Sequence, residues 1–240
     1  MKEMKPRERV LAALHQQPVD RIPYVEHLVD MRVGLETLTD EQRASIFDQM
    51  TEIVGPAKAH KAIGLVSNLG NLNDAESLAF AFEMMGIVEP LLSAALGRDN
   101  VTYWGAAGCF AGGQTYLLDP EEAHRGSAAD GIIKTFEDLD KMVFRTDIDQ
   151  IIQGAEQFLT TKGDLAACAL VFLGLDPCWH SMGFETFCEA CLLDPDLVNE
   201  VLGRITDWYA MVMEEICKLD FDFIWAADDI AYHTSPFFSP

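Results

Sequence analysis

Two adjacent carboxylates follow a short aromatic and apolar run near the end of the sequence. Asp228 and Asp229 come directly after residues 219–227, and His233 lies four positions beyond Asp229. If the run is a buried strand that continues through both acids, their side chains point to opposite faces, so at most one enters a pocket. There it could hold a cationic or amine-bearing group, orient a water molecule, or act as a general acid if burial raises its pKa. An aspartate at a strand end also often caps a turn or helix, and a loop histidine is as readily solvated.

Polar residues also close two other predicted strands. Residues 22–27 read as a short strand with Glu26 and His27 at its carboxyl end, and the apolar run 165–176 ends in Asp176. The carboxyl ends of parallel strands lie on one side of a sheet or barrel, where barrel enzymes keep their reacting groups. The catalytic candidates are therefore Asp228, Asp229 and Asp176, and the substrate-binding candidates are Glu26, His27 and His233.

Thiol and imidazole groups between positions 178 and 191 raise the question of a metal site. Cys178 and His180 are followed by Cys188 and Cys191, and such ligands suit zinc. However, Cys188 and Cys191 share a face with the apolar residues of a predicted helix over 184–192, Leu192 among them, where cysteine behaves as a small hydrophobe. A core role is the favoured interpretation, and no metal ligand is assigned in this chain.

Helices and strands that could position these groups alternate along the sequence. Thr39 and Gln42 form a capping box before a helix that runs to Val54, and the longest apolar stripe follows Asp194 and Pro195 as far as position 219. Further helices are predicted over 6–16, 74–85, 90–96 and 147–162, strands over 22–27, 62–69, 165–176 and 219–227, and a glycine-rich hairpin or lid over 101–118.

Strand, polar tip, helix and strand again is the order of βα units, and it predicts an α/β fold of the TIM (β/α)8-barrel type. About four strands are predicted, half of what closes such a barrel, so we expect an incomplete barrel: about the first four βα units with an N-terminal helical extension. No linker or internal sequence repeat interrupts residues 1–240, which predicts a single domain.

Composition restricts the function further. The formal net charge of −22 argues against nucleic-acid binding, which needs clustered Lys and Arg. No apolar run has the length and continuity of a secretory signal or a membrane span, so a cytoplasmic protein is expected. Six cysteines in such a protein are expected to be reduced thiols.

Two segments near the start and two near the end of the sequence carry a resemblance to a known family. Residues 7–14 read RERVLAAL and residues 20–23 read DRIP, while GFETF at 183–187 leads to the Asp-Pro pair at 194–195, and FDFIWAADDIA at 221–231 leads to Ser239 and Pro240. This pattern resembles the uroporphyrinogen decarboxylase superfamily. The resemblance implies a (β/α)8 barrel with its pocket at the carboxyl ends of the strands, and it implies that the chain is the N-terminal portion of the family's fold.

That superfamily includes porphyrinogen decarboxylases, which work without a cofactor, and methyltransferases that use a corrinoid and a thiol or pterin acceptor. The decarboxylase motif M-R-Q-A-G-R is reduced here to Met31, Arg32, Val33 and Gly34, without the second arginine. The resemblance therefore favours the methyltransferase-like branch, binding a small methyl donor or a tetrapyrrole at the barrel mouth. It implies a corrinoid protein as a partner. Corrinoid and zinc are implied as cofactors only for a full-length protein, since the zinc ligands of the family lie in its C-terminal half.

Two alternatives stay open at this point: a uroporphyrinogen decarboxylase of porphyrin biosynthesis, and a catalytically inert half-barrel. An unpaired last strand would leave a sheet edge through which copies of the chain could associate.

Overall fold

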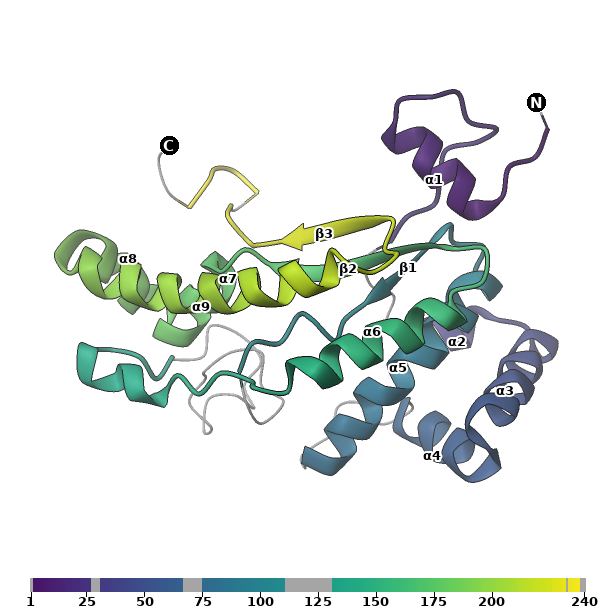
Figure 1. Ribbon diagram of the computed structural model, residues 1–240, viewed down its shortest axis with the longest axis horizontal. Helices are drawn as coiled ribbons and strands as arrows, with labels where there is room; N and C mark the ends of the chain where they lie inside the picture. The colour runs from purple at the N-terminus through teal and green to yellow at the C-terminus, as the bar shows by residue number, and fades with distance from the viewer. Residues whose placement is uncertain (1, 27–30, 67–74, 111–130, 232, 238–240) are drawn as a thin grey trace. The chain divides into compact units, whose positions relative to one another are not determined.

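The computed structural model describes residues 2–26, 31–66, 75–110, 131–231 and 233–237, and shows a mixed α/β fold (Figure 1). The described elements, in chain order, are α1 (Pro6–Leu14), α2 (Met31–Thr37), α3 (Asp40–Val54), α4 (Pro56–Val66), α5 (Ala75–Ala95), β1 (Asn100–Tyr103), the 3-10 helix η4 (Phe136–Lys141), α6 (Ile148–Thr161), β2 (Ala166–Phe172), α7 (Leu175–Met182), α8 (Phe184–Leu193), α9 (Pro195–Ile216) and β3 (Phe223–Ala227). They group into two compact units. Unit 1 comprises Met1–Gly105, Asp149–Leu170 and Ile216–Trp225, and unit 2 comprises Ala106–Ile148, Val171–Glu215 and Ala226–Pro240.

The strands form one small sheet in the order β1-β2-β3, in which β1 runs parallel to β2 with Val101 opposite Ala167. Every residue of β1 is buried, and β2 is buried up to its last residue. Such burial is what a parallel strand covered on both faces requires, and it explains the continuous apolar sequence of β2. β3, at the edge of the sheet, is only half-buried.

Helices with a strong apolar period form where the sequence predicts them. The capping box is present at the start of α3, where the Thr39 side chain accepts a hydrogen bond from the Gln42 backbone and the Gln42 side chain returns one. α6 buries Ile151, Ala155 and Phe158 on one face. In unit 1 a second core joins α3, α4 and α5, with Met50 and Leu92 almost fully buried.

Two predicted strands are wrong. Residues 22–26 form no strand: the Tyr24 carbonyl accepts the Asp99 amide, while the Glu26 amide donates to the Asn100 side chain. Pro23 has no backbone N–H to donate to a neighbouring strand, and the Asn100 side chain takes the place of a strand partner for the Glu26 amide. Residues 62–66 belong to helix α4, which begins at Pro56 and continues through good helix formers; residues 67–69 lie outside the described part.

Two further predictions need correction. The predicted strand 165–176 ends at Phe172 as β2, and Asp176 lies in the first turn of α7, because Gly174 takes a left-handed φ of 114° and turns the chain. In place of the hairpin predicted over 101–118, residues 100–103 pair with β2; residues 111–118 lie outside the described part. The described residues thus contain three strands, where the sequence predicts about four.

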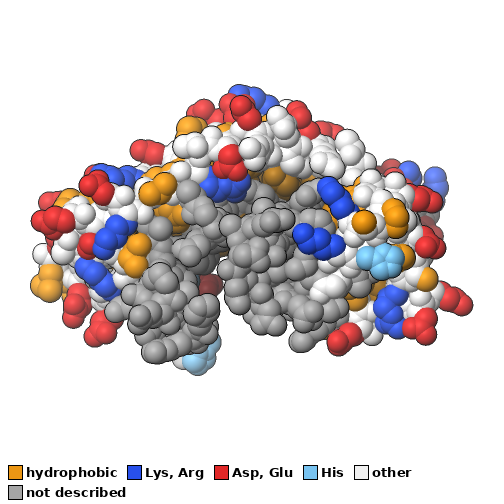
Figure 2. Space-filling model, turned by 90° about the horizontal axis from the view of Figure 1, so that it is seen from below, with side chains coloured by type: hydrophobic (Ala, Val, Ile, Leu, Met, Phe, Trp, Pro, Cys, Tyr) orange, Lys and Arg blue, Asp and Glu red, His pale blue; other side chains and the backbone are white. Residues whose placement is uncertain are grey.

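Unit 2 packs η4, α7, α8 and α9. Trp208 and Tyr209 of α9 are buried, and they donate hydrogen bonds to the carbonyls of Arg145 (2.9 Å) and Ala107 (2.5 Å). The predicted apolar stripe of α8 is correct at Phe187, which is 2% exposed, but wrong at Leu192, which is 85% exposed. No helix within the described ranges combines the length and apolar character needed to cross a membrane. On the face shown in Figure 2, acidic side chains are interspersed with basic and apolar ones.

Candidate functional site

The carboxylate of Asp228 lies at the amino end of α7, in unit 2. Asp228 is the first residue after β3, and its oxygens accept hydrogen bonds from the backbone amides of Leu173 (3.1 Å) and Asp176 (2.8 Å). It therefore bridges the end of β3 to the turn after β2. The amides at a helix start carry partial positive charge and favour a carboxylate here. Asp228 thus does cap a helix, although it is the helix that precedes it in the chain.

Asp176 lies beside this carboxylate, and His180 lies beside Asp176. Both belong to α7 and are one helical turn apart, and the His180 Nε2 lies 3.6 Å from the Asp176 Oδ1. Asp176 is buried, while the His180 side chain is 24% exposed and stacks on the ring of Trp179. The site therefore contains two carboxyl groups and an imidazole whose positions are fixed by one short helix.

Burial shifts the pKa values of two of these groups. The pKa of Asp228 is raised, mainly by desolvation and in smaller part by the nearby charge of Asp176, although the backbone hydrogen bonds act the other way. Burial lowers the pKa of His180 to about 4, and the carboxylate of Asp229 only partly opposes this. His180 is therefore neutral at pH 7, where it can pass on or accept a proton.

This arrangement is suited to proton transfer. A carboxyl group with a raised pKa holds its proton closer to neutral pH than an ordinary aspartate, and can donate it to a reacting group as a general acid. A second carboxylate nearby favours the protonated form of the first. The neutral, partly exposed imidazole of His180 beside Asp176 can exchange protons with solvent.

Of the other predicted site residues, Asp229 acts on the pKa of His180 through its charge. Asp229 and His233 are exposed in unit 2, and β3 ends at Ala227, so the strand does not continue through Asp228 and Asp229. Glu26 lies in unit 1, where its backbone amide and carbonyl make hydrogen bonds with the side chains of Asn100 and Arg98. His27 lies outside the described residues. The structure brings together Asp176 and Asp228 of the predicted set.

Sequence reasoning considered His180 only as a metal ligand beside Cys178. The signal for its actual position is the spacing of four from Asp176, which places both side chains on one helical face once residues 175–182 are read as a helix. The cysteines lie in apolar surroundings: burial raises the pKa of Cys178 to about 12 and raises those of Cys188 and Cys191. Across the described residues, no group of three or more His, Cys, Asp or Glu could hold a metal ion.

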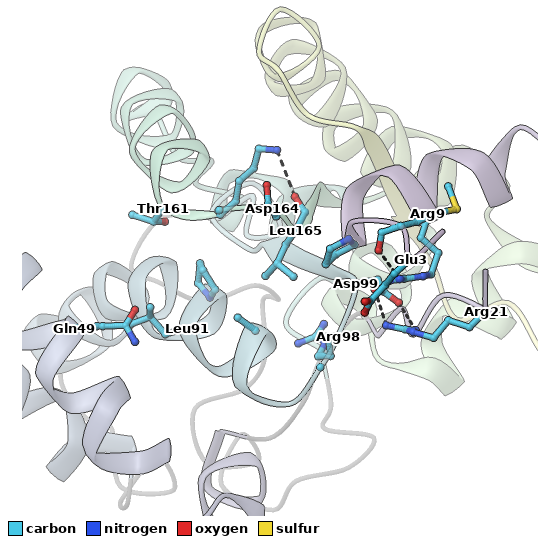
Figure 3. Close-up of a pocket in the computed structure, with 17 residues that line it drawn as sticks. Glu3, Arg9, Arg21, Gln49, Leu91, Arg98, Asp99, Thr161, Asp164 and Leu165 are labelled. Carbon is cyan, nitrogen blue, oxygen red and sulfur yellow. Dashed lines mark hydrogen bonds and ion pairs between the residues drawn. The ribbon is translucent and has the colours of Figure 1, made fainter. Parts of the chain in front are cut away.

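Unit 1 contains a separate pocket of about 410 Å³. Figure 3 shows Arg9 of α1 and Arg21 converging on Asp99 at one side of it. The Asp99 side chain is fully buried and also accepts the Tyr24 amide at 2.7 Å. These arginines are held by carboxylates, so their role is to fasten residues 20–24 to the start of β1. Among the described residues that line this pocket there is no predicted site residue.

Comparison with protein-family models, with curated proteins and with solved structures found no match to this chain.

Proposed function

We propose that this protein is a methyltransferase-like enzyme of the uroporphyrinogen decarboxylase superfamily, with a sheet of the (β/α)8-barrel type. The proposal rests on the resemblance carried by residues 7–14, 20–23, 183–187, 194–195, 221–231 and 239–240, together with one structural observation. Two carboxyl groups follow neighbouring strands: Asp228 follows β3 and Asp176 follows β2. Both lie at the start of α7, where the charge of Asp176 helps to raise the pKa of Asp228. Barrel enzymes place their reacting groups at such strand ends.

In this proposal Asp228 acts as the general acid. The bond between the methyl carbon and its heteroatom breaks, the methyl group passes to the acceptor, and the heteroatom keeps the electron pair and takes the proton from Asp228. A positioned general acid typically contributes about 10²–10⁴-fold to a rate. The charge of Asp176 adds to the desolvation that raises the pKa of Asp228, and His180 exchanges protons with solvent. The acceptor implied by the resemblance is a corrinoid, which accepts methyl groups and would be carried by a partner protein.

A cytoplasmic location is part of the same proposal. All six cysteines are free thiols, and three of them are buried. Free thiols of this kind suit a reducing compartment.

The test is methyl transfer to cob(I)alamin by the purified protein, followed by absorbance, with methanol, methoxyaromatic compounds and methylamines as donors. We expect Asp228→Asn to lower the rate by about a hundredfold or more, since an amide cannot give up a proton. Asp207→Asn is the matched control, because Asp207 is an exposed acid on α9. Release of CO2 from uroporphyrinogen without methyl transfer would identify a decarboxylase instead. Inactivity with every substrate would favour an inert protein.

A further inference from the structure

Unit 1 contains a buried carboxyl group outside the candidate site. Glu89, on α5, is 6% exposed, and one of its oxygens accepts the backbone amide of Thr102 in β1 at 3.2 Å. The same oxygen lies 3.5 Å from the Nη1 of Arg98, whose side chain is fully buried. In place of the water molecules that solvate an exposed carboxylate, Glu89 has the Thr102 amide and the more distant Arg98 guanidinium.

Arg98 connects this carboxyl group to residues 22–26. Its Nη1 donates to the Ser93 hydroxyl at 2.9 Å, and its Nη2 donates to the Glu26 carbonyl. The Asn100 side chain holds the same residue from the other side, accepting the Glu26 amide and donating to its carbonyl, each at 3.0 Å. Figure 3 shows Arg98 next to Asp99, whose amide donates to the Tyr24 carbonyl. Helix α5, strand β1 and residues 22–26 therefore meet at one buried polar cluster.

The charges around Glu89 do not compensate for its burial. Desolvation raises the pKa of Glu89 to about 7, although Arg98 and the Thr102 amide both act to lower it. A second titratable group, Cys168 of β2, interacts with Glu89, and burial raises the pKa of that thiol to about 11, so it is uncharged at neutral pH. Glu89 therefore changes charge in the range where cells vary their pH.

We infer that Glu89 is a pH-sensitive latch: protonated, it allows α5, β1 and residues 22–26 to pack closed, and its ionisation loosens them. The sign follows from linkage, since a carboxyl group that holds its proton more tightly in the closed state favours that state below neutral pH and opposes it above. The opening should increase as the pH rises from about 4.5, the ordinary pKa of glutamate, and level off above about 7. This inference stands on unit 1 alone; only an effect on substrate binding through Glu26 would rest on the proposed function.

Amide hydrogen exchange of the full chain tests the latch directly. After correction for the intrinsic rate, protection of the Glu26, Asp99 and Thr102 amides should fall by about ten- to a hundredfold between pH 5 and pH 8. The isosteric variant Glu89→Gln should lose this dependence while the Ala155 amide of α6 stays unchanged in both proteins. Glu52→Gln, at an exposed site on α3, should behave like the wild type.

The latch is refuted if the wild type shows no pH dependence at these amides, or if Glu89→Gln keeps it in full. Should the variant not fold, titration of the wild-type Glu89 carboxyl carbon by NMR decides the question. A midpoint close to 7 supports the latch. A midpoint at the ordinary value for glutamate overturns it.

Discussion

At the scale of single residues, Asp228 satisfies both interpretations that its sequence position allows. It caps the start of α7 through two backbone amides, as a structural aspartate does, and burial raises its pKa, as the role of a general acid requires. These effects oppose one another, because hydrogen bonds from amides favour the carboxylate and desolvation favours the acid. Desolvation is the larger effect here, so capping does not exclude catalysis.

His180 gives a prediction about stability that is independent of any activity. Its pKa is lowered to about 4 from 6.5, so the unfolded state takes up a proton first as the pH falls between these values. The contribution of neutral His180 to the free energy of unfolding is therefore fully present above pH 6.5 and is lost as the pH falls toward 4. Because the side chain is partly exposed, we expect a loss of about 1–3 kcal/mol. Urea unfolding at pH 7 and pH 4.5 should show this loss in the wild type and much less of it in His180→Gln.

The control is His15→Gln, an exposed histidine after α1, which should keep the full loss. If His180→Gln loses as much stability on acidification as the wild type does, His180 is not the group responsible.

At residue scale, the sequence pointed to Asp176 and Asp228 but could not show that they meet. Their proximity depends on the turn at Gly174, which brings the Asp176 amide to the Asp228 carboxylate across 52 positions in the chain. His180 was missed as a partner because the predicted strand ran to Asp176 and no helix was predicted over 175–182, so the spacing of four between Asp176 and His180 had no special meaning.

At the scale of elements, two glycines that look alike in sequence have opposite requirements. Gly174 has a φ of 114°, and a Cβ there would lie 2.9 Å from a methyl carbon of Thr206. Gly203 lies within α9, and a Cβ there would meet nothing within 4 Å. We expect Gly174→Ala to destabilise the protein by about 1–3 kcal/mol through backbone strain and crowding. Gly203→Ala should stabilise it by about 0.5–1 kcal/mol, because alanine favours the helix.

The free energy of unfolding in urea measures both changes, and each variant serves as the control for the other. Equal effects of the same sign would mean that the turn between β2 and α7 does not depend on the left-handed conformation of Gly174.

Elements with a long, regular apolar period were predictable, and short ones were not. α3, α6 and α9 agree with the sequence because caps and period coincide over at least 14 residues in each. β2 and β3 were found from their apolar runs. Residues 22–26 and 62–66 were misread because a few apolar residues fit a strand and a helix equally well, and only tertiary contacts decide. β1 was missed because its four residues lie beside glycines that indicate a turn.

At the scale of the whole molecule, the net charge of −22 should make stability depend on salt. Like charges repel in the compact state, and added ions screen that repulsion. Raising NaCl from about 10 mM to about 500 mM should therefore raise the thermal midpoint, by about 2–4 °C for each kcal/mol of repulsion removed. Chloride is the suitable anion, because sulfate would also strengthen apolar burial. A midpoint that stays constant or falls would show that local ion pairs outweigh the net repulsion.

The α/β class of the whole molecule was predictable from alternating strands and helices, but the barrel was not settled by the described strands. Two parallel strands and an edge strand fit many α/β folds, and closure depends on pairing between strands far apart in sequence. The grouping into two units was also invisible in the sequence, because each unit collects three separate stretches of chain with no linker between them.

The separation of those stretches affects how the protein is made. The Arg7 side chain near the start of α1 pairs with the Asp222 carboxylate just before β3, at 2.7 Å, across 215 positions in the chain. The same carboxylate accepts the Ala167 amide of β2 at 2.9 Å. A ribosome adding about 5–20 residues per second needs roughly ten to forty seconds to travel from one partner to the other. During translation, Arg7 of α1 therefore has no Asp222 to pair with for that time. Unit 1 can be completed only when most of the chain has been synthesised.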